Sequence, residues 1–178
     1  MSFELEVTSQ GWLEPTSADW DPARDDLCSH GDLRLVIGGL EIAAGDGSGD
    51  YAISTSALAL LRTLESDHGR GARVVPTSLV MHCGGLTLVS CPYGIDWSVA
   101  HRDGRVLLGD VVMNETEPFA GLAVDLGEDE NRRAIVAFAQ RAKEPFAAVE
   151  KALDESTRAE YEAFWREYCE LLARAARR

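Results

Sequence analysis

The chain has few cysteines and no long apolar run, and each shortage excludes a class of protein. Four cysteines lie far apart among 178 residues, and none belongs to a Cys-x-x-Cys motif. Their number and spacing exclude a disulfide framework and the common structural zinc sites, so reduced thiols are expected. The longest apolar runs, such as residues 57–61, are far shorter than the roughly 20 residues that span a bilayer.

Other familiar signals are also missing. The amino end lacks the basic start and apolar stretch of a secretory signal, so we expect a cytoplasmic protein. Lysine is scarce, since Lys143 and Lys151 stand against fifteen arginines, a bias typical of GC-rich bacterial coding sequences. The sequence contains neither a Gly-x-Ser-x-Gly nor a His-Glu-x-x-His motif. The glycine-rich segment 45–50 lacks the Lys-Ser/Thr of a phosphate loop and the glutamate of a calcium loop, so we expect no cofactor and no metal.

Negative charge is what the chain has in excess, and it is concentrated at the amino end. Residues 1–50 carry eleven acids and two bases, a net charge of −9 out of −13 for the whole chain. From residue 128 onward, eleven acids stand against ten bases. Such a field attracts basic partners and repels nucleic acid and anionic membranes. We therefore expect neither nucleic acid nor a membrane as a partner.

Glycine-containing turns between alternating segments predict three β-hairpins. The turns are expected at residues 38–39, 84–85 and 103–104, because Gly-Gly and Asp-Gly readily adopt the positive φ that two-residue turns require. In the first hairpin, this register places Leu35 opposite Ile42 on a buried face. The alternation of apolar and polar residues in its strands is typical of an antiparallel sheet.

Three helices are predicted from apolar residues at helical spacing. The first covers about residues 56–67, with Ser54 or Thr55 as its cap. Two more fill the carboxyl-terminal part of the chain, and the last begins near Thr157, where Glu160 completes a capping box. The aromatic stripe of this last helix is expected to pack over the sheet.

Runs of strands followed by runs of helices predict a single α+β domain over residues 1–178. Residues 1–127 are expected to be mainly β and residues 128–178 helical. The strands would form an antiparallel sheet of about six to eight strands. The mid-chain helix would lie at an edge or end of this sheet, and the two C-terminal helices would pack on one face.

The acidic segment between residues 11 and 30 is the first candidate site, because two tryptophans stand among its acids. Aromatic anchors inside a rim of charge favour fast and specific protein association. We therefore expect a non-enzymatic, immunity- or inhibitor-like binder of a basic protein, with a merely solvated edge as the plain alternative. The predicted binding residues are Trp12, Asp19, Trp20, Asp21, Asp25 and Asp26.

Two other functions stay open at this point. A small-molecule-binding or enzymatic domain would use a pocket between the sheet and the last helix. The residues predicted for that pocket are Trp97, His101, Tyr161 and Trp165. A structural domain that dimerises through the aromatic residues of its last helix is the third alternative.

A catalytic cysteine–histidine pair is not expected. His82 and Cys91 share a strand face in the second hairpin, but the predicted register places them about 13 Å apart. A nucleophile and its base need to lie within hydrogen-bond reach of each other. His101 and Asp110 fail on the same ground, and metal binding by His82 and His101 lacks a third ligand.

Overall fold

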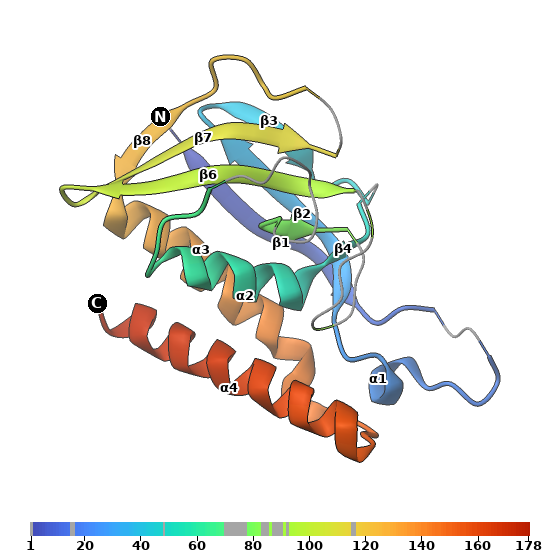
Figure 1. The fold of residues 1–178 in the computed structure, drawn as a ribbon. Helices are drawn as coiled ribbons and strands as arrows, with labels where there is room; N and C mark the ends of the chain where they lie inside the picture. Colours follow the sequence, from blue (N-terminus) through green and yellow to red (C-terminus); the bar gives the residue numbers. More distant parts are fainter. Residues whose placement is uncertain are drawn as a thin grey trace.

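The computed structural model describes residues 2–14, 17–47, 49–69, 78–82, 86, 91, 93–114 and 117–178. Within these residues, eight strands form two four-stranded antiparallel sheets, and three long helices lie along one side of them (Figure 1). The predicted α+β class with antiparallel strands is confirmed, and the strands are divided between two sheets. The second predicted turn, at residues 84–85, lies outside the described residues.

The first sheet comes from the amino-terminal part of the chain. Its strands are β1 (Phe3–Gly11), β2 (His30–Ile37), β3 (Leu40–Ala44) and β4 (Tyr51–Ala52). The order is β1-β2-β3, and β4 pairs with the start of β2. Phe3 lies opposite Ile37 and Leu5 opposite Leu35, so one face of the sheet is apolar and buried.

The first hairpin turns at residues 38–39, as predicted, and both glycines have positive φ, 66° and 87°. Beyond the turn, the register differs from the prediction. A β-bulge places Leu35 opposite Ala43 instead of Ile42. The predicted pairing is wrong because a bulge sets two residues of one strand against one residue of the other.

The second sheet contains the third predicted hairpin. Its strands are β5 (Val80–Met81), β6 (Gly94–Arg102), β7 (Arg105–Met113) and β8 (Val124–Gly127), in that order. The turn between β6 and β7 is confirmed at residues 103–104, which have φ of 50° and 73°. The like-charged Arg102 and Arg105 face each other across this turn, and Arg105 is held by an ion pair to Asp125 on β8 at 2.8 Å.

The mid-chain helix begins and ends earlier than predicted. The helix α2 covers Ile53–Thr63 rather than residues 56–67, and its N-cap, Ala52, makes no side-chain hydrogen bond. Ser54, predicted as a cap, is buried inside the first turn. Its hydroxyl accepts the backbone N–H of Ser29 at 3.1 Å. The helix therefore starts where its hydroxyls serve a neighbouring segment, which local sequence cannot indicate.

The two C-terminal helices, α3 (Glu128–Lys143) and α4 (Glu155–Arg177), lie near their predicted places. The short helix α1 (Pro22–Asp25) and the single 3-10 turn η1 (Glu144–Ala148) were not predicted. Pro145 lies in η1, directly after the end of α3. The capping box predicted for Thr157 and Glu160 is wrong, because α4 is capped by Asp154. The Asp154 carboxylate accepts the Thr157 N–H at 2.8 Å, and the helix begins two residues earlier.

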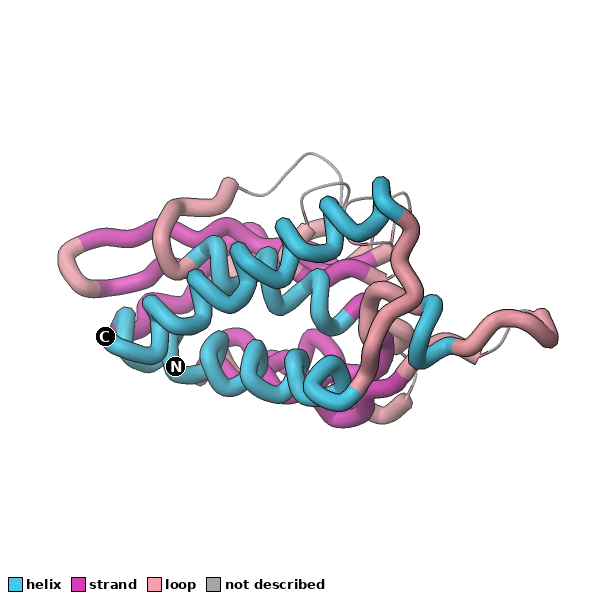
Figure 2. Tube along the Cα trace, turned by 90° about the horizontal axis from the view of Figure 1, so that it is seen from below, coloured by secondary structure: helices cyan, strands magenta, loops and turns pink. Residues whose placement is uncertain are grey.

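One apolar core joins both sheets and the helices. Trp97 of β6 is 1% exposed and meets Phe3 of β1 edge to face, with 6.3 Å between ring centroids. The helices α2 and α3 pack on each other and α4 packs on both (Figures 1 and 2), where the buried Tyr168 hydroxyl donates to the Ala139 carbonyl at 2.7 Å. No helix among the described residues is long and apolar enough to cross a membrane.

Candidate functional site

The segment that follows β1 projects from the body as an arm, residues 12–29, and a buried lysine fastens its base (Figure 2). Lys151 is only 8% exposed, and its ammonium donates to the carbonyls of Ala23 and Asp26. The same ammonium lies 3.4 Å from the centroid of the Trp12 ring, a cation–π contact. Burial lowers the pKa of Lys151. Trp12 is therefore part of the anchor of the arm rather than a free docking residue.

Asp26 also belongs to this anchor. It is buried, and its carboxylate accepts the backbone N–H groups of Leu13 and Cys28, each at 3.1 Å. His30 lies 3.4 Å away. Burial alone would raise the pKa of Asp26, but the bonds from His30 and the backbone hold it below its usual value. Asp26 therefore stabilises the arm from inside and cannot meet a partner.

Two further acids hold the short helix α1. The Asp21 carboxylate accepts the Ala23 N–H at 3.0 Å and caps the helix. Asp25 forms an ion pair with Arg24 at 2.7 Å. The side-chain bond from Arg24 and the backbone N–H of Asp21 lower the pKa of Asp25 to about 2. Of these two, only Asp21 remains exposed to solvent.

The fastening of the arm brings a second acidic segment beside it. The Ala152 N–H donates to the Arg24 carbonyl at 3.2 Å, so α1 lies against the start of α4 (Figure 1). Three exposed acids, at positions 150, 154 and 155, stand at this junction. We call the combined surface the acidic end. Its exposed carboxylates include Asp19, Asp21, Glu150, Asp154 and Glu155.

The four residues of the alternative pocket are not brought together. Trp97 is buried in the core. Tyr161 and Trp165 line an apolar groove between η1 and α4, where Trp165 packs on Phe146 with 4.4 Å between centroids. His101 lines a different cavity, at the other end of α4. His101 therefore lies near the end of α4, whereas the three residues predicted to line a pocket with it lie elsewhere.

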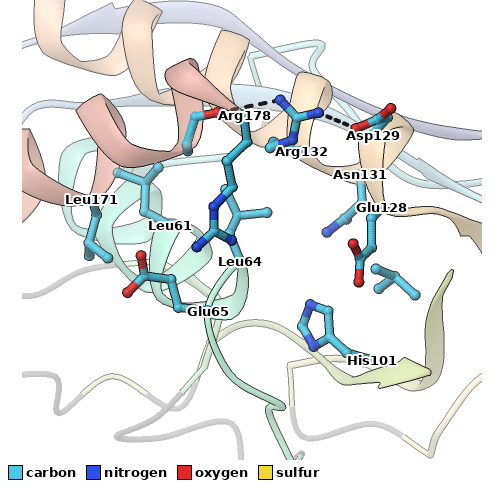
Figure 3. Close-up of a pocket in the computed structure, with 12 residues that line it drawn as sticks. Leu61, Leu64, Glu65, His101, Glu128, Asp129, Asn131, Arg132, Leu171 and Arg178 are labelled. Atoms are coloured by element: carbon cyan, nitrogen blue, oxygen red, sulfur yellow. Dashed lines mark hydrogen bonds and ion pairs between the residues drawn. The ribbon is translucent and has the colours of Figure 1, made fainter. Parts of the chain in front are cut away.

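The cavity at His101 has a volume of about 160 Å³. It lies between the β6–β7 hairpin, the end of α2, the start of α3 and the end of α4 (Figure 3). His101 is held by Asp67, whose carboxylate accepts its backbone N–H at 2.8 Å and contacts its Nδ1 at 3.0 Å. These two bonds lower the pKa of Asp67. Asp67 therefore orients the imidazole through its Nδ1 and does not contact its Nε2.

The expected separation of His82 and Cys91 is wrong. The Cys91 Sγ lies 3.7 Å from the His82 Nδ1, a weak contact. The register used for the prediction assumed a long hairpin, whereas the described part of β5 is only Val80–Met81 and pairs with β6. The His82 ring packs against Tyr51 and Tyr93. No carboxylate of a described residue is hydrogen-bonded to His82, so nothing in this part of the structure orients it as a base.

Comparison with protein-family models, with curated proteins and with solved structures finds no match. Among the described residues, no group of three histidine, cysteine or acidic side chains is arranged to hold a metal ion. The interpretation of the chain therefore depends on its own geometry. That geometry offers two surfaces, the acidic end and the His101 cavity, at opposite ends of α4 (Figure 1).

Several residues of these surfaces were not predicted from the sequence. Asn131 carried a readable signal, since it occupies a position of the α3 stripe that continues with Ile135 and Phe138, all three buried. A polar residue on an otherwise buried face is informative. No pattern in the sequence indicated Lys151 or Glu150, because their importance comes from a contact between segments far apart in the chain.

Proposed function

We propose that the protein is a non-enzymatic interaction protein that binds a basic protein through the acidic end, as an inhibitor-like partner in the bacterial cytoplasm. The observation that carries this proposal is the docking of the arm on the start of α4. It joins the acids of two distant segments into one surface. The net charge of −13 supplies a long-range field that accelerates encounter with a cation-rich partner.

The acidic end is pre-organised, which favours specific binding. Its base is fixed by the buried Lys151 and by Asp26, so little chain entropy is lost when a partner binds. Two apolar side chains stand on the arm beside the acids: Leu13 is exposed and Trp20 half-buried. Aromatic and aliphatic anchors of this kind carry most of the binding energy at protein interfaces, while rim charges govern the rate and the salt dependence.

A pull-down from the source cell tests the proposal. The protein is immobilised at about 50 mM salt and eluted by a rise to about 500 mM, which screens exposed charges. The triple variant Asp19→Asn/Glu150→Gln/Glu155→Gln removes three charges from the acidic end. We expect this variant to bind the captured basic protein about tenfold more weakly. Trp20→Ala should weaken the binding further.

A matched triple variant controls for net charge. Glu6→Gln/Asp103→Asn/Glu130→Gln removes the same three charges from exposed positions elsewhere. If both triple variants weaken binding equally, the effect belongs to total charge and the acidic end is not the docking surface. A partner that resists salt elution would also contradict the proposal. Sedimentation of the protein alone separates this function from self-association, because a dimer would show a mass that depends on concentration.

A further inference from the structure

The His101 cavity combines an apolar floor with charged walls. Ligand sites are typically apolar clefts with a few placed polar groups that orient the bound molecule. The floor of the cavity is aliphatic, and its side chains come from α2, from α4 and from the β6–β7 hairpin. The floor residues are Leu61, Leu64, Val106, Leu171 and Ala175.

Three ion pairs satisfy most of the charges around this cavity. They are Asp129 with Arg132, Glu65 with Arg174, and Asp67 with His101. Two charged residues of the lining are left over, Glu128 from the start of α3 and Arg178 from the end of α4. Neither forms a side-chain hydrogen bond or salt bridge with another residue in the described ranges, and Arg178 lies near enough to Glu65 to help lower the pKa of that carboxyl. One anion and one cation without a hydrogen-bonded partner thus stand at the same cavity (Figure 3).

A buried amide lies between them. Asn131 is 2% exposed, and its side chain points into the cavity (Figure 3). In the part of the chain that the structure describes, its amide makes no hydrogen bond. The amide is reached from the cavity, where water or a ligand can satisfy it. The amide can donate to one group of a ligand and accept from another, since it carries both functions.

We propose that this cavity binds a small aliphatic zwitterion, a free α-amino acid. Glu128 receives its ammonium, Arg178 receives its carboxylate, and its side chain lies on the leucine floor. Asn131 bonds the polar groups between them. A dianion fits poorly because Glu65, Glu128 and Asp129 repel it, and a lone amine leaves the Arg178 guanidinium without a hydrogen-bonded partner. The site is independent of the acidic end, which lies at the other end of α4.

Calorimetric titration of the full chain with L-valine, L-leucine and L-methionine tests the proposal. At least one of them is expected to bind saturably below about 10 mM. Isoamylamine and isocaproate carry the aliphatic body of leucine with only one of its two charges. We expect each of them to bind at least about tenfold more weakly, because one charge-assisted hydrogen bond is lost.

Two variants and their neighbours locate the site. Glu128→Gln and Arg178→Gln should each weaken the binding of the amino acid about tenfold. Glu130→Gln and Arg177→Gln alter the same charges on exposed positions of the same two helices and should bind as the wild type does. The proposal is overturned if none of the three amino acids binds, if a single-charge analogue binds as well as leucine, or if the two site variants bind unchanged.

Discussion

The ammonium of Lys151 lies 3.4 Å from the centroid of the Trp12 ring and joins the arm to the segment that precedes α4. The same ammonium donates to the Ala23 and Asp26 carbonyls, so one side chain satisfies the end of α1. The loss of this cation would leave two carbonyls near the protein interior without a donor. The arm is therefore the region whose order depends most on a single residue.

Lys151→Met tests this dependence. The variant keeps the length of the side chain but removes its charge and its three donors. We expect it to lower the free energy of unfolding by about 2–3 kcal/mol, because bonds to a charged group are lost and buried carbonyls stay unpaired. Urea denaturation measures the loss, and trypsin should cut after Arg24 much faster than in the wild type.

Lys143→Met is the control, because Lys143 is exposed. Its unfolding free energy should change by less than about 0.5 kcal/mol. If Lys151→Met is equally mild and Arg24 stays protected from trypsin, the arm is held by contacts other than the lysine.

Asp25 should titrate at unusually low pH. Its pKa of about 2 lies below the ordinary value of 3.8, mainly because of the bond from Arg24. Arg24→Gln should return the pKa toward 3.8, as read from the carboxyl carbon shift in an NMR titration. The pair stabilises α1 above the unfolded-state pKa of about 4. That stabilisation is lost as the pH falls toward 2.

Glu65 provides the reference for this titration. Arg174 lowers its pKa at the far side of the molecule, so it should be unaffected by Arg24→Gln. An Asp25 curve that is the same in wild type and variant would show that the arginine does not set the pKa.

Cys28 should be the least reactive of the three described cysteines. It is 1% exposed, and burial raises its pKa from 9.0 to about 11. Below both values, two pKa units reduce the reactive thiolate about a hundredfold. Iodoacetamide at about pH 8 should label the half-buried Cys91 and Cys169 faster than Cys28, because their thiols are more accessible. Peptide mass spectrometry measures the three rates, which should become similar in urea; equal rates in the folded protein would contradict the prediction.

The hairpins at residues 38–39 and 103–104 were predictable because their turns need positive φ, which glycine and aspartate supply locally. The bulges were not. One lies between Asp96 and Ser98, so Trp97 has no partner residue in the ladder of β6 and β7. A bulge depends on how a strand meets its neighbours, and the chain carries no local mark of it.

The candidate sites were harder to predict than the fold. Composition indicated the acidic arm. Two of the six predicted binding residues, Trp12 and Asp26, instead make internal contacts that hold the arm in place. Both residues contact Lys151, which lies more than a hundred residues further along the chain. Burial of a lysine follows from tertiary contacts alone, because lysine is ordinarily a surface residue. For the same reason, the sequence did not predict the cavity that the ends of three helices and a hairpin form.

Trp97 connects the two sheets, and its substitution tests how they are joined. Trp97→Ala should cost about 3–5 kcal/mol of unfolding free energy, since it removes a large buried ring. Trp97→Phe should cost only about 1–2 kcal/mol, because a ring still packs on Phe3 and a costly group disappears. That group is the indole N–H, which is buried and has no hydrogen-bond partner among the described residues. Urea denaturation gives both values, with Trp20→Phe on the arm as a control near zero; equal costs for Trp97→Phe and Trp97→Ala would mean that the indole N–H contributes a bond of its own.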